Sequence, residues 1–344
     1  MTIRMPTTAS LSVRKTMRVM VCPGPGKALM AEDRPVPEPG PGEVIVRVLA
    51  CGVCRTDLHL QDNELENICY PVVPGHQVVG DVWACGPGAT FTKGQRVGAA
   101  WLAWTCGECD FCRRGEENLC DQAQFNGYQH DGGYAEYLCA QANFLIPLDK
   151  SMDPAHTTPL LCGGLIGYRT LRMAGDARRL GIYGFGSAAQ LITQLARHEQ
   201  REVFAFTRPG DHSAQDFARS LGVSWAGGSD EAAPVALDAA LIFAPVGELV
   251  PLALRAVRKG GRVVCGGIHM SDIPSFPYAD LWGERQLRSV ANLTRQDAGE
   301  FMALAARHPI HTRITKYPLA AANEALGDLR GGRISGTAVL TVRD

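Results

Sequence analysis

The stretch GIYGFGSAA at residues 181–189 decides how the second half of this chain folds. Apolar residues at Leu180–Tyr183 predict a strand that leads into it, and a helical pattern runs from Ser187 to about His198. The glycines permit a tight turn and let the backbone approach a diphosphate at the helix N-terminus. In a strand–turn–helix unit this pattern predicts a dinucleotide site, with an unliganded glycine-rich turn as the alternative. We assign the cofactor contacts to Gly184, Gly186, Ser187, Ala188 and Ala189.

Strands and helices alternate beyond this turn. The predicted elements are strands at Val203–Phe206, Ala239–Phe243 and Arg262–Cys265, and helices at Asp211–Leu221 and Glu248–Val257. Lys259-Gly260-Gly261 predicts the stop of the second helix. Alternation at this spacing predicts a doubly wound parallel sheet. Further on, we expect helices at Gln296–Arg307 and Ala320–Leu329 and a final strand at Thr337–Val342.

Residues 1–150 have a different texture, with short β-branched or aromatic runs between Gly-Pro turns. Strands are predicted at Val44–Ala50, Gln77–Ala84, Gln95–Trp101 and Tyr134–Ala140. This half is therefore expected to be a mostly β domain with long loops. The length of 344 residues favours two domains, and 46% apolar with 20% charged residues is an ordinary globular balance.

Charge and hydropathy argue against several classes of partner. Lys and Arg total 34 and Asp and Glu total 35, so there is no electrostatic case for nucleic acid or an anionic membrane. No apolar run is long enough for a spanning helix. Residues 1–16 are rich in Ser and Thr and carry no acid, which predicts a disordered extension, with a transit peptide as the alternative. Without a secretory signal, we predict a reducing, cytoplasmic location.

Four of the 12 cysteines lie in one short loop, at Cys106, Cys109, Cys112 and Cys120. In a reducing compartment, clustered thiols suggest a metal before a disulfide. Two-residue gaps let the chain wrap one ion, and four thiolates complete the tetrahedron that Zn²⁺ prefers. We therefore predict a structural zinc with no open coordination position. An iron–sulfur cluster and four unligated thiols are the alternatives.

Three separated segments offer a second metal site: CGVCRTDLH at 51–59, GHQVVG at 75–80 and LLCGG at 160–164. Each is weak alone, because a single buried cysteine or histidine is more often a packing residue. Together they provide a Cys–His–Cys set. Three protein ligands with one position left for water or substrate are typical of a catalytic zinc.

The CGVCRTDLH, GHxxxG, four-cysteine, LLCGG and glycine-rich motifs occur in the order found in one family. From about Met17 to its C-terminus, the chain resembles the zinc-dependent alcohol dehydrogenases of the medium-chain dehydrogenase/reductase family. The resemblance implies an α/β protein with a GroES-like catalytic domain over residues 17–163 and 292–344. It implies a Rossmann domain over residues 164–291. It also implies two Zn²⁺ per chain, one catalytic and one structural.

Carried over by motif position, Cys54, His76 and Cys162 are the catalytic zinc ligands, whereas Cys51 is a packing residue. Asp57 corresponds to the acid that orients the zinc-binding histidine, fixes its tautomer and raises its basicity.

Two further residues match the proton relay of the family. Thr56 corresponds to the hydroxyl that takes the alcohol proton, and His59 to the imidazole that passes it to solvent. For His59 a solvated surface residue is the alternative. One departure concerns the zinc-binding histidine, which the family commonly follows with Glu and this chain with Gln77. A neutral amide lacks the charge with which that acid is proposed to assist ligand exchange.

The resemblance also places the cofactor. An NAD site usually offers Asp or Glu at the end of its second strand, but this chain has Thr207 and Arg208 there. A hydroxyl beside a guanidinium suits a 2′-phosphate, which favours NADP(H) over NAD(H). The alternative is that Arg208 is a solvated loop residue and Asp211 serves NAD(H). Arg55 lies where the family places a basic residue on the diphosphate.

Trp101 and Trp104 lie in the stretch that lines the substrate cleft of the family, although either could instead pack the core. Two indoles there favour apolar or aromatic alcohols and aldehydes. We predict reversible hydride transfer between a primary or secondary alcohol and NAD(P)⁺, in a homodimer or homotetramer. The alternatives are a polyol or amino-alcohol dehydrogenase, a zinc-free enone reductase, and a non-catalytic protein that binds zinc and nucleotide.

Overall fold

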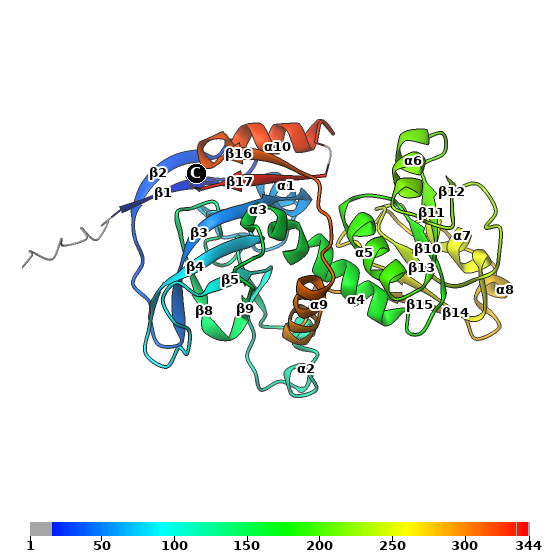
Figure 1. Cartoon of the computed structure of the whole chain (residues 1–344), viewed down its shortest axis with the longest axis horizontal. Coiled ribbons are helices and arrows are strands. Elements are labelled where there is room, and N and C mark those ends of the chain that lie inside the picture. The colour runs from blue at the N-terminus through cyan, green and yellow to red at the C-terminus, as the bar shows by residue number, and fades with distance from the viewer. Residues whose placement is uncertain (1–15, 335, 343–344) are drawn as a thin grey trace, which may run out of the picture.

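The computed structural model describes residues 16–334 and 336–342. The extension expected over residues 1–16 lies outside the described residues, apart from Thr16, which begins the first strand. Figure 1 shows two lobes: a β-rich lobe that holds both ends of the described chain, and an α/β lobe formed by its middle part. The predicted combination of a mostly β half with a doubly wound parallel sheet is confirmed.

Strand β3 (Glu43–Val53) organises the β-rich lobe. It pairs antiparallel with β4 (Val78–Cys85), β8 (Tyr137–Gln141) and β17 (Thr337–Thr341). Its sequence EVIVRVLACGV is almost continuously apolar, as expected for a strand that is covered on both faces. The other strands of this lobe are β1 (Thr16–Val21), β2 (Met30–Pro35), β5 (Arg96–Ala99), β6 (Leu102–Trp104), β7 (Gln124–Phe125), β9 (Leu145–Pro147) and β16 (Ile314–Pro318).

The α/β lobe contains six parallel strands in the order β12-β11-β10-β13-β14-β15. Counted from the first strand of the lobe, this is the 3-2-1-4-5-6 order of the dinucleotide-binding fold. Ligands of such sheets bind outside the carboxyl ends of the two strands where the order reverses, here β10 and β13. The strands are β10 (Arg179–Tyr183), β11 (Glu202–Thr207), β12 (Trp225–Gly228), β13 (Leu237–Ile242), β14 (Val257–Cys265) and β15 (Gln286–Ser289).

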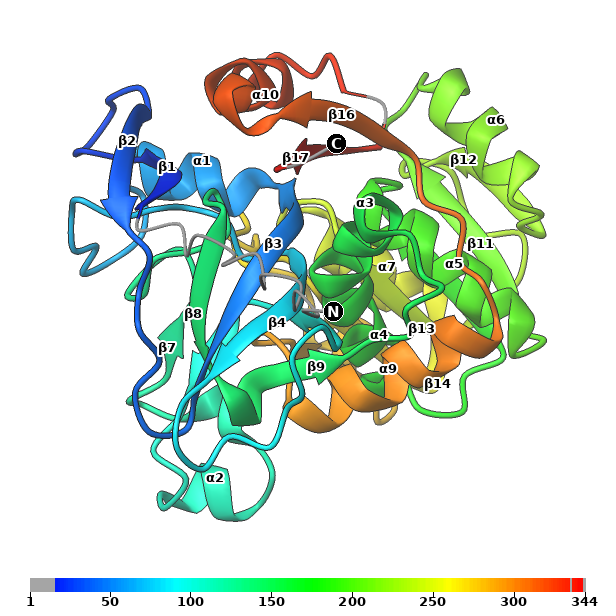
Figure 2. The same cartoon turned by 60° about the vertical axis from the view of Figure 1, so that its left-hand side comes forward.

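The helices α4 and α5 pack against each other at the inner side of the α/β lobe, and α9 packs on α4 (Figure 2). None of the helices in the described part of the chain combines the length and the apolar character that crossing a bilayer requires. The helices are α1 (Arg55–Gln61), α2 (Asp110–Arg113), α3 (Pro154–Thr157), α4 (Gly163–Met173), α5 (Ser187–His198), α6 (His212–Ser220), α7 (Leu249–Ala256), α8 (Tyr278–Leu281), α9 (Arg295–Arg307) and α10 (Ala322–Arg330).

The end of the chain returns to the β-rich lobe. After α9, strand β16 runs parallel to β17, and β17 pairs with β3 (Figure 1). Two hydroxyl groups link this returning strand to the other lobe, since Ser187 Oγ at the start of α5 lies 3.2 Å from Thr337 Oγ1. The first residues of β17 therefore lie beside the dinucleotide turn.

Local details of the α/β lobe differ from the sequence prediction. Helix α7 ends at Ala256, and Lys259-Gly260-Gly261 lies inside β14 instead of ending the helix. Gly260 has a φ of 71°, a left-handed conformation that glycine adopts without strain. Gly260 and Gly261 therefore lie at an irregularity in the pairing of β14 with β13. Strands β12 and β15 were not predicted, because WAGG and QLRS are too short and too polar or glycine-rich to signal a strand.

Candidate active site

A three-ligand cluster lies where β3, β4 and α4 come together. Cys54 follows β3 and caps α1, His76 precedes β4, and Cys162 caps α4. Cys54 Sγ is 3.2 Å from His76 Nε2, and the ligand atoms of all three residues lie within 4.8 Å of one another. A tetrahedral zinc with bonds of roughly 2.0–2.3 Å separates its ligand atoms by about 3.3–3.8 Å. The donor set therefore fits one zinc ion and leaves a fourth position open.

The charges in this cluster favour a cation. The hydrogen bond from the Cys162 thiol, together with His76, holds the pKa of Cys54 well below its usual range. The same hydrogen bond and burial raise the pKa of Cys162 well above its usual range. Burial alone would lower the pKa of His76, but the negative charges of Cys54 and Asp57 raise it to about 10. Negative charge that holds a proton on a buried imidazole marks a place suited to a metal ion.

Asp57 fastens the segments that carry the first two ligands. It is 3% exposed, and its Oδ2 accepts the backbone N–H of Cys54 at 2.9 Å, which closes a capping box at the start of α1. Its Oδ1 accepts the N–H of Gly75 at 3.2 Å and lies 3.5 Å from His76 Nδ1. One carboxylate thus holds the Cys54 turn and lies beside the imidazole, although at 3.5 Å it makes no hydrogen bond to His76 Nδ1 among the described residues.

A cavity of about 390 Å³ opens onto the cluster. Trp101 lines it, with ring centres 5.0 Å from His76 in an edge-on arrangement, and also stacks on Phe125 and Tyr128, so it packs the core as well. Trp104, at the end of β6, is not among the lining residues of this cavity. The apolar part of the wall is completed by Leu161, Ile166, Ile268, Val290, Ala291 and Leu293.

A larger cavity of about 990 Å³ includes the dinucleotide turn, at the carboxyl ends of β10 and β13. Gly184 has a φ of 84°, and a Cβ there would come within 2.7 Å of Ala244, so only glycine fits. Helix α5 begins at Gly186 without a side-chain cap, which leaves its first N–H groups for an anion. Of the predicted contacts, Gly184 and Gly186 line the cavity, whereas Ala189 is fully buried beneath the turn.

The far end of this cavity lies beyond β11, where the exposed Arg208 lines it. The Thr207 hydroxyl is already bonded: it lies 3.3 Å from the Gly227 carbonyl oxygen and accepts the Gln215 amide at 3.2 Å. Asp211 caps α6 by accepting a backbone N–H. Thr207 therefore holds the loop in place, and the guanidinium of Arg208 is the freer group for recognising a ligand.

Thr56 and His59 lie three positions apart on α1 and face different cavities. Thr56 lines the smaller cavity beside the three ligands, and His59 lines the larger one together with Arg55. The two cavities share Gly267 and Ile268 in their walls, so they adjoin each other at this loop. On its other side, His59 Nδ1 hydrogen-bonds the exposed carboxylate of Glu64.

The four-cysteine loop forms a second, separate cluster. Cys106 Sγ lies 3.6 Å from Cys120 Sγ and 3.9 Å from Cys112 Sγ, and all four ligand atoms lie within 4.8 Å of one another. These distances are far too long for a disulfide and match the roughly 3.8 Å between thiolates on one tetrahedral zinc. Backbone N–H groups of Glu108 and Cys109 lower the pKa of Cys106 to about 7, so the loop stabilises a thiolate.

Comparisons with known proteins agree with this geometry. Residues 40–150 match the alcohol dehydrogenase GroES-like domain. The chain is 44% identical to a probable alcohol dehydrogenase, AdhA, from Mycobacterium tuberculosis, over 98% of this chain and 99% of that protein. It is 33% identical to an alcohol dehydrogenase from Geobacillus stearothermophilus, over 92% of this chain and 97% of that protein. The chain belongs to the alcohol dehydrogenase family.

Solved structures share the whole architecture of this dehydrogenase. An acetophenone reductase from Geotrichum candidum in complex with NAD is 27% identical, with a TM-score of 0.84 over 96% of this chain and 98% of that one. A protein named CAD from Helicobacter pylori, complexed with NADP(H), is 22% identical with a TM-score of 0.85 over 96% and 99%. The resemblance to medium-chain alcohol dehydrogenases is thereby confirmed, while the two bound cofactors differ.

Some residues of the dehydrogenase's site were not predicted. Gly267 and Ile268 follow β14, and Asn292 follows β15, yet all line the cavities. The general rule that ligands bind beyond the carboxyl ends of parallel strands is the signal that could have pointed to them.

Gln77 follows His76, at the position where the family commonly has Glu. It is 1% exposed, and its Nε2 has no hydrogen-bond partner among the described residues.

Proposed function

We propose that this dehydrogenase transfers hydride reversibly between the carbinol carbon of a primary or secondary alcohol and NAD(P)⁺, with two Zn²⁺ per chain. The observation that carries the proposal is that the two cavities adjoin at Gly267 and Ile268, so the cavity beside the three-ligand cluster neighbours the cavity of the dinucleotide turn. An alcohol oxygen at the cluster and a nicotinamide in the larger cavity would then be neighbours.

The ligands fit the proposed metals. Cys54, His76 and Cys162 would hold the catalytic zinc, which supplies Lewis-acid polarisation of the alcohol or carbonyl oxygen when bound. Asp57 would orient the imidazole of His76, beside which it lies. The four cysteines of the other loop would hold the structural zinc, because four thiolates leave no open position.

Thr56 and His59 are the proposed path for the alcohol proton. The Thr56 hydroxyl can both accept and donate a hydrogen bond beside the cluster, and His59 lies in the cavity that leads outward. The contact between His59 Nδ1 and Glu64 leaves Nε2 as the nitrogen that exchanges the proton.

We infer a preference for NADP(H) over NAD(H). Arg208 supports this preference, because it is exposed at the end of the cavity where a 2′-phosphate would lie. Arg55, on the opposite wall, suits the diphosphate. The argument for a 2′-phosphate depends on Arg208 and not on Thr207, because the Thr207 hydroxyl already bonds to Gly227 and Gln215.

The cofactor preference is tested with Arg208→Gln. We expect KM for NADPH to rise by about tenfold, the value of one charge-assisted hydrogen bond, while KM for NADH changes less than about twofold. Arg178→Gln, an exposed arginine at the opposite end of the sheet, serves as the matched control. Equal effects on both cofactors would remove the case for a 2′-phosphate site.

The mainly apolar wall of the smaller cavity supports apolar or aromatic alcohols and aldehydes as substrates. Turnover across aliphatic and aromatic aldehydes, polyols and amino-alcohols, with zinc measured on the same sample, tests this choice. A preference for polyols or amino-alcohols would move the protein to another branch of the family. Cofactor binding without turnover of any of these compounds would favour a non-catalytic role.

We further propose a homodimer or homotetramer. Strand β15 is an edge strand with mostly exposed residues, and near it Tyr278 and Trp282 expose 72% and 59% of their surface. Light scattering on the purified protein tests this assembly.

We also assign residues 292–344 to the catalytic domain. The membership of β16 and β17 in the sheet of the β-rich lobe supports this assignment. The cytoplasmic location stays a prediction.

A further inference from the structure

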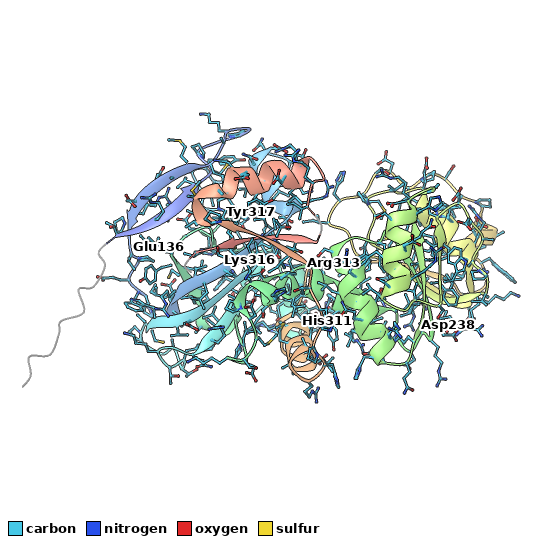
Figure 3. The ribbon with its side chains drawn as sticks, turned by 45° about the horizontal axis from the view of Figure 1, so that its top comes forward. Glu136, Asp238, His311, Arg313, Lys316 and Tyr317 are labelled. Carbon is cyan, nitrogen blue, oxygen red and sulfur yellow. The ribbon has the colours of Figure 1, made fainter. Side chains whose placement is uncertain are left out.

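A third cavity, of about 520 Å³, lies between the carboxyl ends of α5 and α9 and shares no residue with the two cavities of the active site. Two arginines and two histidines line it: Arg197, His198, Arg307 and His308. The rest of its lining is Gln194, Leu195, Pro309 and Ile310, so no carboxylate among the described residues takes part. Figure 3 labels His311 on the segment that leads from α9 towards β16, beside this region.

The two imidazoles face each other closely. His198 is the last residue of α5 and His308 caps the end of α9, and their ring centres are 3.5 Å apart with an interplanar angle of 33°. Desolvation and the charges of His198 and Arg307 lower the pKa of His308. A negative charge placed beside both rings would favour their protonated forms.

The walls of the cavity are fixed in place by Gln194. Its Nε2 donates to the carbonyl of His311 at 3.0 Å, and its Oε1 accepts the N–H of the same residue at 2.9 Å. This two-bond link ties α5 to the segment that follows His308. The fold therefore holds the two helix ends that carry His198 and His308 next to each other.

Structural roles account for only part of the positive charge. Each helix end carries about half a negative charge, so two ends offset about one cation. Arg197 donates to the Leu221 carbonyl at 2.7 Å and Arg307 to the Ala303 carbonyl at 3.2 Å, both neutral acceptors. The neighbouring acid, Glu199, is engaged by Arg172 and Arg201. Two guanidiniums thus leave an excess of positive charge at the cavity before either histidine is protonated.

We propose that this cavity binds a multiply charged oxyanion of the phosphate class at the edges of the stacked His198 and His308 rings, with Arg197 and Arg307 alongside. Such an anion accepts several charge-assisted N–H bonds at once. A transition metal fits less well, because it needs a third ligand: the described residues form two groups of three or more metal-binding side chains, and neither group contains this pair. The proposal does not depend on the dehydrogenase reaction.

The test is calorimetric titration of the purified full-length protein with inorganic phosphate, while saturating NADPH or NADH occupies the cofactor cavity. We expect saturable binding of phosphate, and the pH dependence is measured with sulfate, which stays doubly charged across the pH range used. Sulfate should bind at least about tenfold tighter at about pH 6 than at about pH 8, because an anion favours protonated imidazoles. A second arm with AMP distinguishes a free phosphate from the phosphate group of a larger metabolite, and either ligand would satisfy the proposal.

The double variant His198→Gln/His308→Gln should weaken phosphate binding by at least about tenfold. His130→Gln, which removes an exposed histidine of the β-rich lobe, is the matched control and should bind as the parent does. Should the double variant fail to fold, Arg307→Gln at an exposed position gives the same comparison. Undiminished phosphate binding by these variants, sulfate binding that tightens as the pH rises, or binding of Zn²⁺ instead of phosphate at the pair would overturn the proposal.

Discussion

The two cysteine clusters of this dehydrogenase have similar ligand atoms but are assembled in opposite ways. Cys106, Cys109, Cys112 and Cys120 come from one loop, and backbone N–H groups of that loop stabilise the Cys106 thiolate. The Cys54 cluster draws its ligands from three segments that only the folded sheet brings together. A local cluster can support its own loop, whereas a cluster assembled by the fold can keep one side open to a cavity.

The surroundings of the two clusters differ in the same sense. Around the Cys54 cluster, Asp57 is buried with its Oδ1 3.5 Å from His76 Nδ1, and Trp101 forms part of an adjoining cavity. No cavity described above is lined by the four cysteines of the loop. We therefore expect the Cys54 cluster to serve the reaction and the four-cysteine loop to serve stability, and substitutions at each can separate these two roles.

The largest expected effect is on activity, at the open cluster. Cys54→Ala removes one of three ligands, and we expect kcat/KM to fall by about a thousandfold or more, because Lewis-acid stabilisation of the transition state contributes several kcal/mol. Zinc content should fall from two to one per chain, with a nearly unchanged melting temperature. Metal analysis and thermal unfolding of the same preparation check both points. An active variant without that zinc would show that the cluster is not catalytic.

The second effect is on stability, at the loop. Cys112→Ser should also leave one zinc per chain, but here we expect the free energy of unfolding to fall by roughly 3–5 kcal/mol, since a structural metal contributes directly to folding. The kcat of the molecules that remain folded should change little. Cys69→Ser, at an exposed free cysteine, is the matched control. A loss of kcat without a loss of stability would contradict the division of roles.

The comparison also explains what the sequence could predict. The metal site of the four-cysteine loop can be predicted from spacing alone, because its four ligands are close along the chain. The turn at Gly184 and helix Ser187–His198 are likewise local, and the predicted helix has the observed bounds. The distance of 22 positions from Cys54 to His76 has no such meaning by itself, so that assignment needed the family resemblance.

The misses have a physical cause in each case. Cavity residues such as Ile268 and Asn292 lie in loops whose positions depend on packing between distant strands. Trp104 matches Trp101 in type, but it lies in β6 away from the cavity wall, whereas Trp101 lies just before that strand and lines the cavity. Thr207 lines the larger cavity as a predicted contact should, but its hydroxyl also bonds to Gly227 of the neighbouring strand β12, which the sequence did not predict.

A smaller effect concerns Cys51, which lies in the same CGVC motif as Cys54 but on β3. It is fully buried, burial raises the pKa of its thiol, and a Cβ on Gly75 would come within 2.8 Å of its Sγ. We expect Cys51→Ala to lower the free energy of unfolding by about 1 kcal/mol while both zinc ions and kcat are retained. Loss of a zinc ion from this variant would mean that the motif contributes both cysteines to the metal.

The smallest effect probes how far the open site extends beyond its ligands. Glu64 hydrogen-bonds His59 Nδ1, but 58% of its side chain is exposed, so solvent screens the contact. Exposed ion pairs contribute roughly 0.2–1 kcal/mol, which predicts a kcat lower by about 1.4-fold to fivefold for Glu64→Gln with KM nearly unchanged. If Glu64 positions the relay, the pH profile of kcat should shift as well, whereas Glu66→Gln at a nearby exposed acid should leave it in place. An unshifted profile would confine the catalytic role to the cluster, Thr56 and His59.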